Sequence, residues 1–165
     1  MVVLLAVSGA SMARGTYMEP EAFVREAFGG RMPPSRVVWI TDAMRAEIVR
    51  ILDHSFQQGR VRYWKEGARS VWVLEETGKE EPITSGIIVQ GGKIDLIKVL
   101  VYRESRGEEV RYPRFTDQFR NAGMTSKHDL DRPIDGISGA TLSVQALTKL
   151  ARLALYLDKN DKERK

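Results

Sequence analysis

Four segments rich in β-branched and aromatic residues follow one another in the middle of the chain, and they constrain the fold more than any other feature. They span residues 61–65, 70–75, 83–90 and 93–102. Only Gly91-Gly92 separates the last two, and this pair can adopt the positive φ angles of a tight hairpin turn. Consecutive hairpins predict an antiparallel meander, not the strand–helix alternation of a nucleotide-binding parallel sheet.

Helices and one further strand are predicted before this meander. Residues 20–28 have helical spacing, and Gly29-Gly30 ends the helix because glycine accepts a left-handed C-cap conformation. Residues 37–40 form a short predicted strand. Thr41 or Asp42 caps a second helix, which is expected to run to Gly59 with one apolar face made of Met44, Ile48, Ile51, Leu52 and Phe56.

The chain after the meander is polar at first and then helical. A short helix is expected around residues 115–119, and a last helix with an apolar stripe covers about residues 142–157. The predicted fold class is therefore α+β, with an antiparallel β-sheet meander, packed helices and a glycine-containing loop that leads into the C-terminal helix.

The length of 165 residues suits one domain with its own core. Residues 1–13 contain an apolar run followed by Ser11-Met12-Ala13, and they are interpreted as a truncated signal peptide or a disordered N-terminus. This run is too short to span a bilayer. Residues 14–60 are expected to pack on the main domain at residues 61–157, and residues 158–165 form a charged tail.

The composition excludes several classes of site. The absence of cysteine excludes disulfides, thiolate metal sites and iron–sulfur ligation, and two histidines are too few for a histidine-rich metal site. The formal charge of +4 comes from lysines and arginines that are scattered among acidic residues. Because no basic arm or stripe is present, no nucleic-acid partner is expected.

Chemistry is concentrated in residues 133–147, with the sequence PIDGISGATLSVQAL. Gly136 and Gly139 allow tight turns, and Ser138, Thr141 and Ser143 provide three hydroxyl groups just before a helix. A helix start favours a phosphate because its backbone N–H groups are free. The alternative is an ordinary helix start, in which Ser138 or Thr141 is the N-cap and the glycines only turn the chain.

The stretch from Asp135 to Ser143, DGISGATLS, closely resembles the flavin-attachment motif of the FMN-binding domain family. This family includes the flavin subunits of sodium-pumping NADH:quinone reductases and Rnf-type complexes, and also small single-domain exported flavoproteins, which this chain resembles most. The resemblance implies that the Thr141 hydroxyl becomes a phosphoester of FMN. It also implies a Mg²⁺-dependent flavin transferase as partner, with FAD as the donor.

The resemblance covers about residues 61–157 and so identifies this part of the chain as the FMN-binding domain. Upstream of the motif, the segment YRESRGEEV at residues 102–110 resembles the family's Glu and Gly element, represented here by Glu104 and Gly107. Tyr102 joins the expected cofactor site with Glu104 because both end a long strand near the polar loop. In the motif, the expected cofactor-binding residues are Asp135, Gly136, Ser138, Gly139, Ala140, Thr141, Leu142 and Ser143. Asp135 either acts during attachment or forms a turn by bonding backbone N–H groups. Arg106, Arg111 and Arg114 either meet the phosphate or are solvated loop charges. No catalytic residue and no metal ligand is assigned.

The function implied by the resemblance is electron transfer, because a bound flavin supplies the redox chemistry. The chain is expected to be an electron carrier more than a stand-alone enzyme. It would pass electrons from a membrane-associated donor to an exported acceptor, in the periplasm or another extracytoplasmic compartment and with possible attachment to the membrane. The alternative function belongs to another class of protein, namely a non-redox binding or sensing module that holds a ligand non-covalently or holds none.

Overall fold

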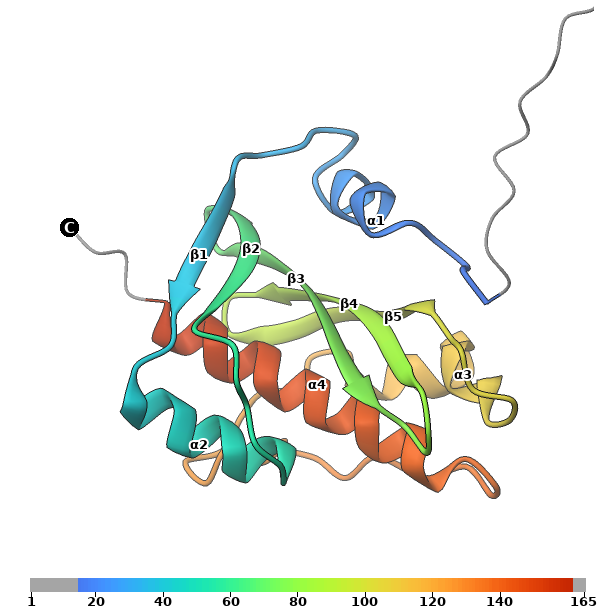
Figure 1. Ribbon diagram of the computed structural model, residues 1–165. Helices are drawn as coiled ribbons and strands as arrows, with labels where there is room; N and C mark the ends of the chain where they lie inside the picture. Colours follow the sequence, from blue (N-terminus) through green and yellow to red (C-terminus); the bar gives the residue numbers. More distant parts are fainter. Residues whose placement is uncertain (1–14, 162–165) are drawn as a thin grey trace, which may run out of the picture.

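A five-stranded antiparallel sheet forms the centre of the structure (Figure 1). The computed structural model describes residues 15–161. The strands lie in sequence order across the sheet and are β1 (Ser35–Trp39), β2 (Arg60–Glu66), β3 (Arg69–Thr77), β4 (Pro82–Gln90) and β5 (Lys93–Val101). The predicted antiparallel meander is confirmed, and β1 extends it by one strand at the edge.

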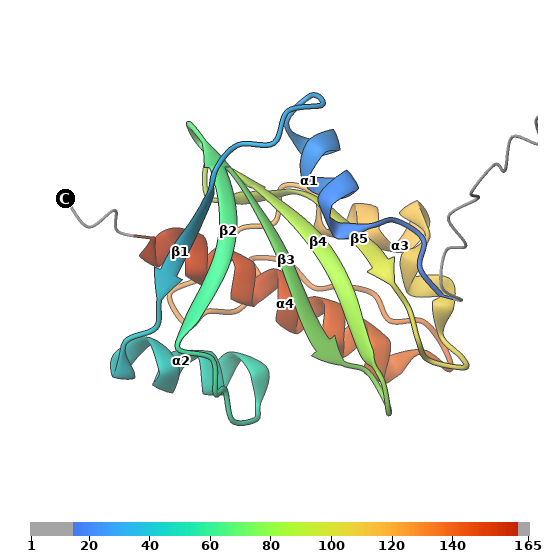
Figure 2. The ribbon, with the colours of Figure 1, turned by 45° about the horizontal axis from the view of Figure 1, so that its top comes forward.

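The turns between the strands follow from glycine and from short connections. Gly91 and Gly92 have φ angles of 58° and 77°, so they form the predicted tight turn between β4 and β5. The turn between β3 and β4 consists of residues 78–81, since Thr77 pairs with Pro82. This second turn reaches the end of the molecule at which the last helix begins (Figure 2).

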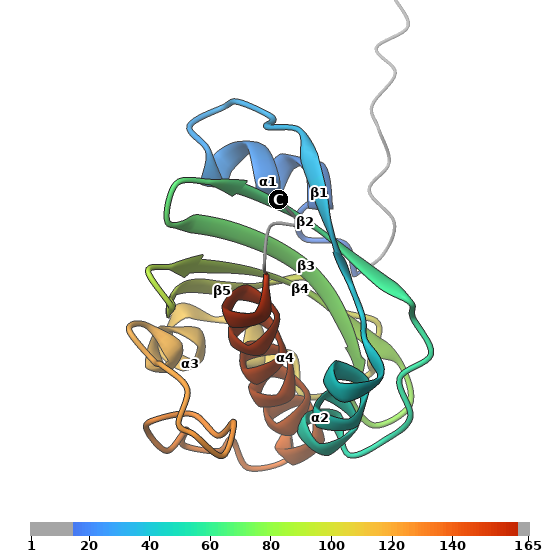
Figure 3. The same ribbon diagram turned by 90° about the vertical axis from the view of Figure 1, so that its left-hand side faces the viewer.

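Helices cover both faces of the sheet. The long helix α4 (Thr141–Asn160) lies along one face beside α2 (Asp42–Leu52), and α1 (Pro20–Ala27) lies on the opposite face (Figure 3). Between β5 and α4 the chain forms three short helical segments, namely η1 (Glu108–Arg111), α3 (Pro113–Thr116) and η2 (Asp117–Phe119).

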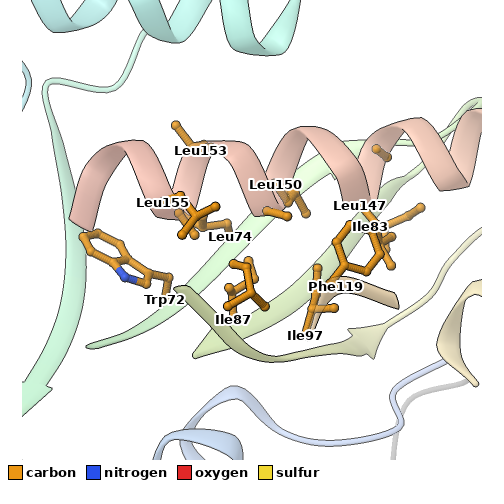
Figure 4. Packing of buried hydrophobic residues seen from close by; sticks show 14 of the residues in the cluster. Trp72, Leu74, Ile83, Ile87, Ile97, Phe119, Leu147, Leu150, Leu153 and Leu155 are labelled. Carbon is orange, nitrogen blue, oxygen red and sulfur yellow. The ribbon is translucent and has the colours of Figure 1, made fainter. Parts of the chain in front are cut away.

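The core has two parts because successive side chains of a strand point to opposite faces. On the α4 side, Trp72 and Ile87 belong to one buried cluster with helix residues that include Leu150 and Leu155, and Trp72 lies at the Leu155 end of the helix (Figure 4). On the α1 side, Val71 and Ile88 pack around Phe23 together with Leu100. A helix thus shields each face of the central strands from water, which explains the long apolar run of β4.

The end of α2 differs from the sequence-based expectation, and its start decides between the two expected N-caps. The helix α2 ends at Leu52 and does not continue to Gly59, because Asp53 adopts the left-handed conformation with a φ of 59°. Phe56 therefore lies beyond the helix, although it still packs against the core. Thr41, rather than Asp42, is the N-cap of α2, and its Oγ1 accepts a hydrogen bond from the Met44 N–H at 3.2 Å.

The predicted signal segment at residues 1–13 lies outside the described residues, and so does the last half of the predicted charged tail, residues 162–165. The first part of that tail is helical, since α4 continues to Asn160 and does not end near residue 157. Within residues 15–161, no helix combines the length and the apolar character needed to cross a membrane.

Candidate functional site

The helix α4 begins within the glycine- and hydroxyl-containing motif. Its N-cap is Ala140, and no side chain caps the helix start. The Val144 N–H donates to the Ala140 carbonyl at 2.9 Å, which is the first helical hydrogen bond. The alternative of an ordinary N-cap by Ser138 or Thr141 is therefore wrong. The first-turn N–H groups at Thr141, Leu142 and Ser143 are left without a side-chain cap.

Side chains of the first helical turn differ in their exposure. Thr141 is exposed as the first helical residue, and Leu142 is 45% exposed, whereas Ser143 is buried. Gly139 has a φ of 81° and so turns the chain into the helix in a conformation that other residues rarely adopt. Ser138 and Gly136 are exposed on the loop before it. The motif therefore presents the Thr141 hydroxyl to solvent.

A cleft of about 360 Å³ lies at this helix start, and three chain segments line it. The β3–β4 turn contributes Lys79, and the segment after β5 contributes Glu104, Ser105 and Arg106. The third segment is the motif itself, with Gly139, Ala140, Thr141, Leu142 and Ser143. The structure thus brings Glu104 next to the motif, although the two are far apart in the chain.

Tyr102 lies beneath the cleft and ties two of these segments together. Its hydroxyl donates to the Arg106 carbonyl at 2.5 Å and lies 2.9 Å from Ser143 Oγ. Because the carbonyl can only accept, the Tyr102 proton points to Arg106, and Ser143 donates to Tyr102. Burial raises the pKa of Tyr102, with the Ser143 hydrogen bond acting in the opposite direction. The phenol is thus kept protonated in the form that makes both bonds.

Glu104 holds the β3–β4 turn. Its Oε1 accepts three backbone N–H groups, from Lys79 at 2.5 Å, Glu80 at 2.8 Å and Glu81 at 3.1 Å. Desolvation by itself raises the pKa of Glu104, but the three N–H donors outweigh it and the pKa lies below its usual value. The carboxylate therefore stays ionised and bound to the turn.

Asp135 is held through its backbone. Its N–H donates to Gln118 Oε1 at 2.7 Å, and its carbonyl accepts from Gln118 Nε2 at 3.4 Å. The Asp135 side chain is exposed and has no hydrogen bond or ion pair within residues 15–161. The turn-forming alternative for this carboxylate is thus not observed, and the group is free to act on something outside the protein.

The three candidate arginines have different surroundings. Arg106 lines the cleft. The Arg111 guanidinium lies 4.4 Å from the ring centres of both Tyr17 and Tyr112, so those rings engage it. Arg114 is exposed on α3 and is not among the residues that line the cleft.

Two residues at the site were missed by the sequence analysis. Lys79 lies about sixty positions before the motif, and Gln118 lies in a segment whose only signal was a short predicted helix. Both reach the motif through contacts that a linear pattern does not reveal.

The residues of this cleft suit a phosphate group. Uncapped N–H groups of α4 and the side chains of Lys79 and Arg106 would attract an anion. The exposed Thr141 hydroxyl at the same place can form an ester bond.

Comparison with protein families gives a match that includes every residue lining the cleft. Residues 78–156 match the family model described as FMN-binding domain. No curated protein and no solved structure matches the chain.

Proposed function

Residues 78–156 belong to the FMN-binding domain family, and we propose that this chain carries its FMN covalently on Thr141 and works as an electron carrier. The observation that supports the covalent link is the position of Thr141. Its hydroxyl is exposed at an uncapped helix start, inside a cleft lined by two cationic side chains. A helix start of this kind stabilises a phosphate directly beside the hydroxyl.

The attachment reaction follows from the chemistry of a hydroxyl and FAD. The Thr141 oxygen attacks the phosphorus on the riboflavin side of FAD, and the bond to the bridging oxygen of the pyrophosphate breaks. AMP leaves with that oxygen, and the hydroxyl proton is transferred to a base. A Mg²⁺-dependent flavin transferase would supply the metal and the base. Asp135 is proposed as the residue that this enzyme recognises or uses to orient the hydroxyl, since its carboxylate is exposed and unpaired within residues 15–161.

The residues around Thr141 would then hold the phosphate. The N–H groups of Leu142 and Ser143 lie in the uncapped first turn of α4. The Ser143 hydroxyl donates to Tyr102 and would not be available for the phosphate. Gly139 and Ala140 bring the chain to the helix start without a large side chain, so the approach to Thr141 stays open.

The bound flavin would accept and donate electrons, which is the chemistry that the protein itself lacks. We propose a membrane-associated donor and an exported acceptor as its redox partners. An ester bond would be useful outside the cytoplasm, because a tethered cofactor cannot diffuse away.

Intact mass spectrometry tests the covalent link. The protein is produced in cells with and without a flavin transferase. We expect a mass increase of one FMN minus water only with the transferase. Thr141→Ala should remove this increase. Thr148→Ala is the matched control, because the Thr148 hydroxyl donates to the Val144 carbonyl at 2.8 Å within the same helix. An unmodified wild-type protein would favour the non-redox binding or sensing module instead.

A further inference from the structure

We propose that Lys79 and Arg106 supply the countercharge for the phosphate on Thr141, and that Glu104 is the positioning residue for Lys79. The inference rests on the proposed ester at Thr141 and names residues outside the attachment motif. Lys79 and Arg106 come from two separate segments that meet the helix start at the cleft.

The charges that line the cleft match one phosphodiester. Its lining residues include two cations, Lys79 and Arg106, and one anion, Glu104. The lining therefore carries one net positive charge. A phosphate esterified to both riboflavin and threonine carries a single negative charge at neutral pH. With the phosphate in place, the charges of the phosphate and of the lining residues would sum to zero. The Lys79 ammonium also lies 3.9 Å from Glu80 Oε1, and both of these side chains are exposed, so this ion pair is weak and the ammonium can turn to the cleft.

Hydrogen bonds hold the β3–β4 turn that carries Lys79. The Gly78 N–H donates to the Glu81 carbonyl at 3.1 Å, and the next three N–H groups all donate to Glu104 Oε1. All four backbone donors of the turn are thus bonded. A β-carbon on Gly78 would lie 2.8 Å from Glu104 Oε1, so the turn packs too closely on this carboxylate to admit a side chain.

The same turn also lies against the first turn of α4. A β-carbon added to Gly78 would lie 3.5 Å from Ser143 Oγ. The backbone just before Lys79 is therefore next to the helix that carries Thr141. On the opposite side, the Arg106 carbonyl is bonded to Tyr102, and Tyr102 is bonded to Ser143. The segments that carry the two cationic residues therefore both lie next to the same helical turn.

The negative charge of Glu104 would weaken phosphate binding if no other group compensated it. Its carboxylate lines the cleft and would repel a phosphate. Three N–H donors satisfy Oε1, and they direct the carboxylate to the turn. We infer that Glu104 acts through Lys79, since it sets the backbone from which this ammonium group extends.

Lysine labelling with an amine-acetylating reagent tests this assignment. Wild-type protein is labelled with and without the flavin, and the rate at each lysine is measured by peptide mass spectrometry. We expect Lys79 to react about threefold more slowly after flavin attachment, the effect of an exposed ion pair. Lys93 is the control, since it is exposed and outside the cleft, and its rate should not change. An equal Lys79 rate in both forms would overturn the assignment.

Variants of Glu104 test its positioning role on folded, flavin-loaded protein. Glu104→Gln keeps an acceptor oxygen and should retain the slower labelling of Lys79, whereas Glu104→Ala should lose it. In each variant the comparison is made between molecules with and without the flavin. Slower labelling of Lys79 in flavin-loaded Glu104→Ala, to the same degree as in wild type, would contradict a role through Lys79.

The ³¹P resonance of the phosphodiester tests both cations. It should shift in Lys79→Gln and in Arg106→Gln, and it should keep its position in Lys93→Gln. Wild-type protein without an adduct would contradict the proposed function. An adduct whose resonance is the same in all these variants would contradict only the present inference.

Discussion

The hydroxyl groups of Tyr102 and Ser143 lie 2.9 Å apart in the interior beneath the cleft. Tyr102 follows the last strand of the sheet, and Ser143 belongs to the first turn of the last helix. The bond therefore joins the two elements that enclose the proposed phosphate position. Since both side chains are buried, the bond also has an energetic consequence that can be measured.

Tyr102→Phe should destabilise the protein more than Ser143→Ala. The phenylalanine leaves the part-buried Arg106 carbonyl and the buried Ser143 hydroxyl without their bond, at a cost of about 1–3 kcal/mol. Ser143→Ala keeps the bond from Tyr102 to Arg106 and should cost about 1 kcal/mol. Urea denaturation gives both free energies of unfolding. Equal losses in the two variants would argue against the assigned direction of the hydrogen bonds.

Gly107→Ala should combine backbone strain with a steric clash. Gly107 has a φ of 85°, and a β-carbon there would lie 2.9 Å from Tyr102 Oη and 3.2 Å from the Ala140 β-carbon. Gly30→Ala is a matched control, since Gly30 has a φ of 91° and open space around it. The control should cost about 1 kcal/mol of unfolding free energy. Gly107→Ala should cost roughly 1–3 kcal/mol more.

If Gly107→Ala and Gly30→Ala had equal unfolding free energies, the close packing of Gly107 on Tyr102 would be refuted. We also expect less flavin attachment in Gly107→Ala only, because only this glycine adjoins the helix start.

Asp135→Asn should separate attachment from stability. The side chain is exposed and unpaired within residues 15–161, and the backbone bonds to Gln118 remain in the variant. The free energy of unfolding should therefore change by less than about 0.5 kcal/mol. We expect the rate of flavin attachment to fall, as followed by intact mass over time. An unchanged rate would remove Asp135 from the attachment reaction.

The stability of the protein should depend on pH through His54. The ring nitrogens of His54 lie 2.9 Å from both Glu76 carboxylate oxygens and 2.9 Å from the Ser55 carbonyl, so only the protonated ring can donate to both sides. The Glu76 hydrogen bond, followed by that to Ser55, raises the pKa of His54. Because the folded pKa is the higher one, this contribution is fully present below the unfolded pKa of about 6.5. It is lost as the pH rises through the folded value.

His54→Gln should therefore be less stable than wild type near pH 6 and nearly equal to it near pH 9. The imidazole is about half exposed, so the largest difference should stay below about 1 kcal/mol. Urea denaturation of both proteins across this pH range measures it. A difference in unfolding free energy that does not vary with pH would show that the charge of His54 does not contribute to stability.

The sheet could be predicted because each strand and the glycine turn are recognisable from their own residues. Each strand has a dense β-forming composition, and the Gly91-Gly92 pair marks a hairpin by its conformational freedom. The end of α2 could not be located in this way. Asp53 takes the left-handed position where glycine is more usual, and the packing of the following loop decides this.

The part of the candidate site that is continuous in the sequence was the easiest to identify. The segment from Asp135 to Ser143 contains the motif, so its residues could be named from their order alone. The neighbour Lys79 depends on how the β3–β4 turn reaches the start of α4. Glu104 was expected at the cofactor, and the structure adds that its carboxylate binds the backbone of that turn. Such contacts arise from tertiary packing and leave no local pattern.

Peptide mapping of the flavin-loaded protein tests the central claim most directly. The protein is produced with a flavin transferase, denatured and cleaved with trypsin. Cleavage should yield residues 128–149, because the bond between Arg132 and Pro133 resists the protease. Fragmentation of this peptide should assign the added FMN to Thr141. FMN on Ser138, Ser143 or Thr148, or a peptide with no added mass, would contradict the account.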